Sequence, residues 1–340
     1  MPLTWRSSLI WENVLGMTLR WRTVVERQTE TRCYRMGSVP EALAPRERLY
    51  FLNGESDPNG AEHDLPASVL CRLPAAPLLH LDLPGRAGLQ QRTRLRTLTT
   101  KVAGETLLNR LNCLPSSPPA TAVKEADEWN VVRSTRHSPW RVLTAQEMLR
   151  ILALPPTLLD PLPDLAPAEY GKMVGESMDV RTVLRAIYSR RDELQSYHRI
   201  NAALFFNGLG ASLVALAHLH AAGMIKLGTV VIVEIDARRT EAVLAWFHAQ
   251  PELAGVQVEV LGDIRDISDC AFVDLARRIG GFHLMIGGFP CNNTSGSNHH
   301  TDGERGRVGL DGEHSGLFID MMRLALSVQH VALLWPVLRT

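Results

Sequence analysis

The second half of the chain alternates short apolar runs with helix-forming segments, and this alternation constrains the fold more than any other feature. The predicted strands cover residues 201–210, 229–235, 256–261 and 282–286, the first ending in a glycine-rich turn, and the predicted helices cover 212–224, 239–248 and 316–328. Strands that alternate with helices usually pair in parallel, with helices on both faces of the sheet. The pattern therefore predicts an α/β fold with a doubly wound sheet.

The first half carries weaker signals. Short strands are expected at 8–14 and 49–53, and helices at 145–152 and 180–195. Proline-rich connections at 115–119 and 155–167 discourage both helix and sheet, because proline has no N–H to donate. With 340 residues and a hydrophobic content of 45%, the chain is long enough for one large or two modest cores.

Cysteine use and hydropathy exclude several classes of protein. The five cysteines are widely spaced, with no CxxC pair, which fits neither a disulfide framework nor a zinc site. The histidines at 299, 300 and 314 also match no common zinc spacing, so no metal is expected. No run reaches the roughly 18 apolar residues that a membrane span needs, so no membrane partner is expected. We infer free thiols in a reducing compartment.

The charge balance is neutral overall but uneven along the chain. Lys plus Arg and Asp plus Glu each total 36, which counts mildly against a nucleic-acid enzyme. Basic residues cluster in two stretches, however. The first, from 84 to 110, contains Glu105 as its only acid and has Arg86, Arg92, Arg94, Arg96, Lys101 and Arg110; the second has Arg133, Arg136 and Arg141. Local clusters, more than the total, determine whether phosphates are attracted. Either stretch alone is more typical of a solvated surface.

Three successive strand ends carry groups suited to a nucleoside. The turn Phe206-Asn207-Gly208-Leu209-Gly210 lies between a predicted strand and helix, where glycines let the backbone approach a ligand. Glu234 follows the next strand and can accept hydrogen bonds from ribose hydroxyls, and Asp263 follows the third strand and can accept from an adenine amine. Each acid alone is more often a helix cap. Leu213 replaces a third glycine, which favours a ligand without a pyrophosphate, such as S-adenosylmethionine.

The segment Gly287-Gly288-Phe289-Pro290-Cys291-Asn292-Asn293 follows the fourth predicted strand of this half. A free cysteine is usually buried among apolar groups, but the flanking Gly, Pro and Asn argue against simple core packing. The segment resembles the Pro-Cys nucleophile loop of cytosine-5 DNA methyltransferases. Together with Gly296-Ser297-Asn298 and His314-Ser315, it is most similar to the plant domains-rearranged methyltransferases.

Further motifs of that family are found elsewhere in the chain. Its Glu-Asn-Val strand matches residues 10–14, with Glu12 and Asn13, and its arginine pair matches Arg46 and Arg48. Ala44 stands where the family has glutamine. The late Gly-Asn-Ser motif corresponds to Gly175-Glu176-Ser177, so Glu176 replaces an asparagine. A carboxylate near the cofactor's own carboxylate would repel it, which favours weaker cofactor binding that Glu176→Asn would relieve.

The resemblance implies a site, a cofactor and a substrate. Cys291 is implied as nucleophile, with Glu12, Asn13, Arg46 and Arg48 acting on the cytosine. S-adenosylmethionine is implied as cofactor, held by Phe206, Asn207, Gly208, Gly210, Glu234, Asp263, Pro290 and Ser177. Double-stranded DNA is the implied partner, with a homodimer or a heterodimer with a related methyltransferase, and the nucleus is the implied location.

The order of the motifs implies a circular permutation. Glu-Asn-Val opens the chain and the cofactor half closes it, the reverse of the usual arrangement; permutation is tolerated where the original termini lie close together. The expected fold is thus a permuted Rossmann-like methyltransferase with a small target-recognition subdomain. Catalytic elements are expected in residues 1–83, DNA contacts in 84–145, the late-motif helix in 146–199 and the cofactor-binding half in 200–340.

Two other functions remain open. One is a catalytically inactive paralogue that binds DNA or a partner, kept in view by Ala44, Asn207 and Glu176. The other is a methyltransferase acting on RNA cytosine or on a small molecule.

Overall fold

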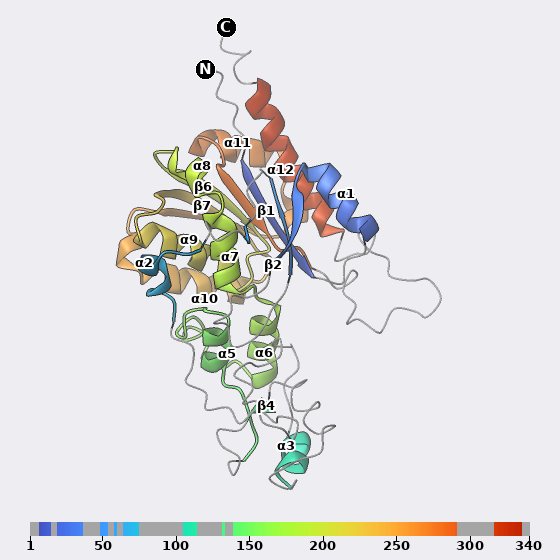
Figure 1. Ribbon diagram of the computed structural model, residues 1–340, viewed down its shortest axis with the longest axis vertical. Helices are drawn as coiled ribbons and strands as arrows, with labels where there is room; N and C mark the ends of the chain where they lie inside the picture. The colour runs from blue at the N-terminus through green and yellow to red at the C-terminus, as the bar shows by residue number, and fades with distance from the viewer. Residues whose placement is uncertain are drawn as a thin grey trace.

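A seven-stranded sheet forms the centre of the molecule (Figure 1). The computed structural model describes residues 7–14, 19–36, 48–53, 58–59, 64–74, 105–113, 131–132, 139–290 and 316–334. The strands of the sheet, in spatial order, are β2 (Arg32–Met36), β3 (Arg48–Leu52), β1 (Ser8–Val14), β9 (Leu284–Gly287), β6 (Ile200–Phe205), β7 (Leu227–Val233) and β8 (Gln257–Leu261). A separate two-stranded ladder joins β4 (Val131–Val132) and β5 (Arg141–Val142).

The sheet is mostly parallel, and its strand order reflects the permuted chain. Strands β8, β7, β6, β9 and β1 pair in parallel, while β3 runs antiparallel to both β1 and β2. If the strands are renumbered along the chain with β6 as the first, β9 as the fourth and β1 as the fifth, the spatial order from β8 to β2 reads 3-2-1-4-5-7-6. The first five positions follow the doubly wound nucleotide-binding order. The predicted α/β Rossmann-like fold, entered in permuted order, is confirmed.

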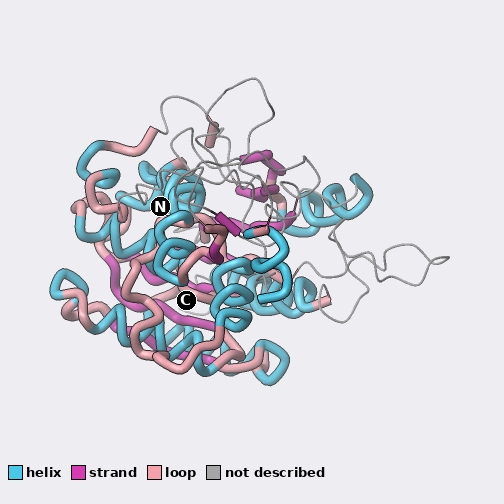
Figure 2. The backbone as a smooth tube through the Cα atoms, turned by 90° about the horizontal axis from the view of Figure 1, so that it is seen from below, coloured by secondary structure: helices cyan, strands magenta, loops and turns pink. Residues whose placement is uncertain are grey.

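Helices cover both faces of the sheet, as Figure 2 shows from below. The helical segments are α1 (Leu19–Thr29), α2 (Ala67–Leu70), α3 (Glu105–Asn112), α5 (Ala145–Ile151), α6 (Pro167–Glu176), α7 (Val180–Tyr188), α8 (Arg191–Gln195), α9 (Ala211–Ala221), α10 (Ala237–His248), η2 (Pro251–Leu253), η3 (Ile264–Asp266), α11 (Asp269–Ile279) and α12 (Leu317–Leu334).

Alternate residues of the strands feed two hydrophobic cores. Leu204 belongs to the core that includes Leu216 of α9, whereas its neighbour Phe205 belongs to the core that includes Phe272 of α11. The alternation follows from the strand period of two. Helices α5, α6, α7, α9 and α10 therefore lie with the first core, and α1, α11 and α12 with the second.

Several elements differ from the sequence prediction. The helix expected at 180–195 is two helices, α7 and α8, because the backbone at Arg190, with φ of −106° and ψ of 9°, leaves the helical conformation. Helices α1, α6 and α11 and strand β2 were not anticipated. Two of these had readable signals: α6 begins at Pro167, a favoured first position, and α11 begins after Ser268 as N-cap and ends at Gly280.

Among the described residues, no helix is long and apolar enough to cross a membrane.

Candidate active site

Four parallel strands end at the same level, and the fifth, β1, continues to Val14 beside β3, which creates one functional edge. Gly287 of β9 pairs in register with Trp11 of β1 on one side and with Phe205 of β6 on the other. Phe205 pairs with Val233 of β7, and Val233 pairs with Leu261 of β8. The residues that follow these positions therefore lie along one line at the carboxyl edge of the sheet, where ligands of doubly wound folds bind. They are Glu12, Gly288, Phe206, Glu234 and Gly262.

The turn between β6 and α9 is built for close approach. Phe206, Gly208 and Gly210 all have left-handed backbones, with φ of 52°, 53° and 73°. A side chain on Gly210 would meet Val243 of α10 at 3.0 Å, so glycine lets α10 pack against the turn. Buried Asn207 places its Oδ1 where no described residue donates to it. A buried acceptor without a donor is costly, so this atom indicates a ligand N–H or O–H.

Glu234 is fixed directly above this turn. Its Oε2 accepts from the Gly208 amide at 2.7 Å, and its Oε1 accepts from the Asp236 amide at 3.0 Å. Each carboxylate oxygen keeps a further lone pair for a ligand hydroxyl. Ile235, the next residue, is 66% exposed although it is large and apolar. The sequence did not identify Ile235 as a site residue. Its exposed aliphatic side chain beside the fixed acid offers a surface that a flat ligand can cover.

Asp263 forms an ion pair with the nearby Arg265. Arg265 donates to both of its carboxylate oxygens, at 3.0 Å and 2.5 Å, and the Arg265 amide also donates to it at 3.0 Å. The hydrogen bonds from Arg265 hold the pKa of Asp263 below its usual value, so the group is ionised at neutral pH. Its predicted contact with an adenine amine requires a lone pair that Arg265 leaves available, and stays a prediction.

The turn after β9 brings Glu12 next to the segment that carries the predicted nucleophile. A side chain on Gly287 would meet Met321 Sδ of α12 at 2.5 Å and Trp11 Cε3 at 3.2 Å, so this position has little room for one. The position of a side chain on Gly288 lies 3.2 Å from Glu12 Oε2. Pro290 is half-buried and is the last described residue of this turn, while Cys291 lies outside the described residues. The Glu12 carboxylate thus lies beside Gly288, which is three residues before Cys291 in the chain.

Glu12 is held by one of the two predicted arginines. Arg48 opens β3 opposite Val14, and its Nε lies 3.0 Å from Glu12 Oε1. Both side chains are mostly buried, 18% and 13% exposed, so the pair is partly shielded from water. Arg46 and the side chain of Asn13 lie outside the described residues.

The late-motif residues lie at the carboxyl-terminal end of α6. Buried Ser177 donates to the Met173 carbonyl of its own helix at 2.9 Å, so its hydroxyl is partly committed to capping α6. Glu176 pairs with Arg239 of α10, with Oε2 2.5 Å from Nη2. The ion pair places a cation beside this carboxylate, which argues against the expected repulsion, and tighter binding by Glu176→Asn stays a prediction. Sequence analysis did not identify Arg239.

Little of the predicted DNA-contacting region is described. Arg110 is exposed on α3. Arg141 instead forms two hydrogen bonds of 2.7 Å to Glu147, which also closes the capping box of α5 through Thr144. The remaining basic residues of 84–141 lie outside the described residues.

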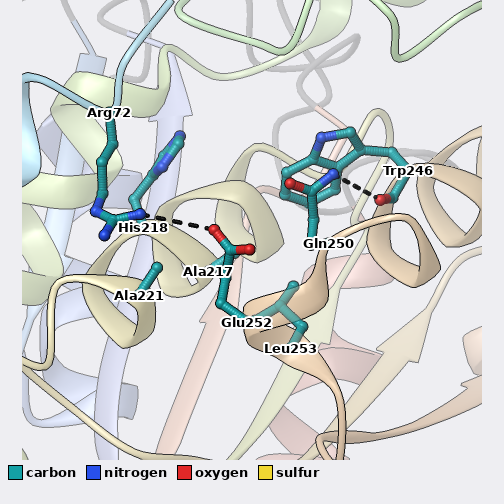
Figure 3. A pocket seen from close by; sticks show the side chains of 8 residues that line it. All are labelled: Arg72, Ala217, His218, Ala221, Trp246, Gln250, Glu252 and Leu253. Carbon is teal, nitrogen blue, oxygen red and sulfur yellow. Dashed lines mark hydrogen bonds and ion pairs between the residues drawn. The ribbon is translucent and has the colours of Figure 1, made fainter.

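A cavity of about 230 Å³ lies elsewhere, between α9, α10, η2 and the segment after α2 (Figure 3). Arg72 and Glu252 approach to 3.6 Å across it. No predicted site residue lines it. The lining comes from the carboxyl-terminal parts of α9 and α10, whereas the predicted site lies at their amino-terminal ends. The cavity is therefore distinct from the carboxyl edge.

The fold and the edge define a class: a Rossmann-like methyltransferase domain with a fixed acid above a glycine turn. No protein-family model matches the chain. DNA (cytosine-5)-methyltransferase DRM1 of Arabidopsis thaliana is 32% identical over 250 residues, covering 71% of this chain and 38% of that protein. The DRM2 proteins of Oryza sativa subsp. japonica and Arabidopsis thaliana are 32% and 30% identical, covering 71% and 69% of this chain and 38% and 37% of their own lengths.

The predicted resemblance is therefore confirmed. Over about 70% of its length, the chain is homologous to DNA (cytosine-5)-methyltransferases of the domains-rearranged type. The chain spans less than two fifths of the length of the curated relatives it matches.

Proposed function

We propose that the chain is a DNA cytosine-5 methyltransferase that uses S-adenosylmethionine. One observation carries the proposal: Glu12, from β1, stands against Gly288, in the turn leading to Cys291, at the edge that also carries the Gly208 turn and Glu234. A nucleophile segment, an acid and a nucleoside site thus converge from opposite ends of the chain. The homology to proteins named for this activity supports the same conclusion.

The carboxyl edge fits the cofactor. Glu234 is oriented by two backbone amides and is suited to accept from both ribose hydroxyls. Asn207 Oδ1 offers a buried acceptor, and Ile235 offers an apolar surface for the adenine. Asp263 is proposed to accept from the adenine amine, with Pro290 and Ser177 bordering the methionine end. The bound cofactor supplies an electrophilic methyl group on its sulfonium.

The chain's own residues are proposed to activate the cytosine. C5 of cytosine is a weak nucleophile, so the Cys291 thiolate first bonds to C6 and shifts electron density to C5. Glu12 protonates N3 or shares a proton with it in a hydrogen bond, so that negative charge does not build up on the ring, and Asn13 orients the Glu12 loop. Arg48, with Arg46, holds the base oxygen and a nearby phosphate. After C5 takes the methyl group, its proton leaves to solvent and the C6–sulfur bond breaks, which restores the thiolate.

The substrate is proposed to be double-stranded DNA with the target base flipped out, because C5 and C6 are inaccessible within a stacked duplex. The basic stretch between 84 and 141 is proposed to contact phosphates. A dimer with a second copy or a related methyltransferase, and a nuclear location, are proposed from the resemblance alone.

A tritium-transfer assay with labelled S-adenosylmethionine tests the function directly. We expect label to enter duplex DNA, with none entering RNA or reactions without acceptor. Cys291→Ala should abolish transfer, while Cys270→Ala, which removes an exposed cysteine of α11, should not. Transfer to RNA alone would favour the RNA methyltransferase, and binding of DNA without transfer would favour the inactive paralogue.

A further inference from the structure

Arg239, in the first turn of α10, is held from two sides. Its Nη2 lies 2.5 Å from Glu176 Oε2 at the end of α6, and its Nε lies 3.1 Å from Asp236 Oδ2, without the geometry of a hydrogen bond. Its side chain is only 15% exposed, so water screens these charges incompletely. The guanidinium therefore links the late-motif segment to the start of α10.

The same contacts continue to the cofactor acid. Asp236 caps α10, accepting from the amides of Arg238 and Arg239 at 3.0 Å and 3.2 Å, and its own amide donates to Glu234. Glu234 in turn accepts from Gly208. An unbroken series of polar contacts thus runs from Glu176 through Arg239 and Asp236 to the carboxylate above the glycine turn.

Arg239 also lies beside the turn itself. Its Nη1 is 3.8 Å from the position that a side chain on Gly208 would take. Three carboxylates, those of Glu176, Asp236 and Glu234, belong to this series, and Arg239 is the cation that pairs with two of them. Removing it would leave like charges close together, which shifts the flexible ends of these side chains apart.

We propose that the Glu176–Arg239 ion pair is a positioning device of the cofactor site, which sets the orientation of Glu234 and of the Gly208 turn. The inference rests on the proposed function and adds a specific role to two residues that touch neither the methyl group nor the cytosine. Arg239 acts through Asp236 and Glu234, so its effect falls on cofactor affinity and not on the chemical step.

A second ion pair between the same two helices provides a matched control. Arg238 Nη1 lies 3.1 Å from Glu169 Oε1, joining α10 to α6 as the first pair does. Both partners are 47% exposed, and neither contacts Asp236, Glu234 or Gly208 through its side chain in any described interaction. A pair that merely ties α6 to α10 would behave like this one.

The test compares S-adenosylmethionine binding by calorimetry for the wild type and for Glu176→Gln, Arg239→Gln, the double variant, Arg239→Lys, Glu169→Gln and Arg238→Gln. We expect Glu176→Gln and Arg239→Gln each to weaken binding about three- to tenfold. The double variant should bind no more weakly than Arg239→Gln, because partners in one interaction are not additive. Arg239→Lys should retain most of the affinity, and the two control variants should lie within about twofold of the wild type.

Turnover distinguishes positioning from general loss of structure. At saturating cofactor, methyl transfer by Glu176→Gln and Arg239→Gln should equal that of the wild type, with duplex binding and melting temperature also unchanged. Wild-type cofactor affinity in both variants, or an equal loss in the control pair, would overturn the inference while leaving the proposed function intact. A wild-type protein that binds no S-adenosylmethionine would overturn the proposed function and the inference with it.

Discussion

Replacing Glu234 with alanine removes the group on which the cofactor assignment most depends. The carboxylate makes two backbone hydrogen bonds, to the Gly208 amide at 2.7 Å and to the Asp236 amide at 3.0 Å. Hydrogen bonds to a charged group contribute about 1.5–3 kcal/mol each. Losing the bond to one ribose hydroxyl alone should therefore weaken S-adenosylmethionine binding by roughly 10- to 150-fold.

The same substitution also affects the empty protein. Two backbone amides lose their acceptor, but both lie near the edge of the sheet, where water can replace the carboxylate. We expect the free energy of unfolding to fall by about 1–2 kcal/mol, which leaves a protein of this size folded. Loss of affinity should therefore exceed loss of stability, and the two are separable by measuring both.

Calorimetric titration with S-adenosylmethionine, together with urea unfolding, measures both effects. Glu259→Ala is the matched control, because Glu259 is an acid of β8 that accepts two 2.7 Å bonds from Arg278 but lies within the strand and away from the turn. It should leave cofactor affinity unchanged. If folded Glu234→Ala binds the cofactor as tightly as the wild type, the nucleoside site is not where we place it.

Four further predictions follow from the site and the core. A duplex containing 5-fluorocytosine should trap the protein covalently, because fluorine at C5 cannot leave as a proton. Cys291→Ala should abolish the adduct without changing cofactor affinity. An adduct through Cys113 or Cys270, both exposed, would contradict the mechanism. Glu12→Gln and Arg48→Ala should lower methyl transfer at saturating cofactor by at least about 100-fold, since both residues act on the cytosine. The dissociation constant for S-adenosylmethionine should stay nearly unchanged. Weaker cofactor binding with normal methyl transfer would instead place the two residues at the cofactor. Asp263→Ala should weaken cofactor binding by roughly tenfold or more, because a charge-assisted hydrogen bond to the adenine amine is lost. Unchanged binding would mean that Asp263 bonds to Arg265 and not to the cofactor. Burial lowers the pKa of His283 from 6.5 to about 4, so below pH 6.5 the unfolded chain binds a proton that the folded protein excludes. The contribution of His283 to the free energy of unfolding should therefore fall by about 2 kcal/mol between pH 7 and pH 5. His283→Asn retains an acceptor for the Asn201 amide and should show a fall smaller by this amount in urea unfolding; an unchanged pH dependence would refute the assignment.

The sequence predicted the cofactor half more accurately than the first half, for a physical reason. Strands such as β6 and β7 are buried on both faces, so they appear as continuous apolar runs with glycine or an acid at their ends. By contrast, α1 and β2 have mixed polar and apolar residues, because they lie at one edge of the sheet and are only partly buried. Their periodicity is weak, and no pattern in 19–36 indicated them.

Motifs in the sequence select candidate site residues, but they do not identify the partners of those residues. A motif predicts that Glu176 lies near the cofactor, yet it does not identify the partner of Glu176, Arg239, which is 63 positions away in the chain. In the same way, Asp263 was identified by its position after a strand, and its pairing with Arg265 depends on the geometry of η3. Local sequence determines which groups follow a strand, whereas tertiary packing determines what they contact.

The permuted order is compatible with an intact site because of where the chain changes its connections. In an unpermuted sheet, α12 would lead from β9 into β1, which lies beside β9 in parallel. Helix α12 begins near the site, where Phe318 contacts Phe289, and runs back toward the end of the sheet at which β1 begins (Figure 1). The connection between α12 and β1, which this chain lacks, would therefore lie at the amino edge of the sheet. The connection from α8 to β6 lies at the same edge, since Ile200 pairs with Leu227 at the start of both strands. Every described residue assigned to cofactor or cytosine lies at the opposite edge of the sheet or, like Ser177, at the end of α6. Cutting and rejoining the chain at the amino edge leaves the register of Glu12, Gly288, Phe206 and Glu234 unchanged, because that register is set by strand pairing and not by the order in which the strands are connected.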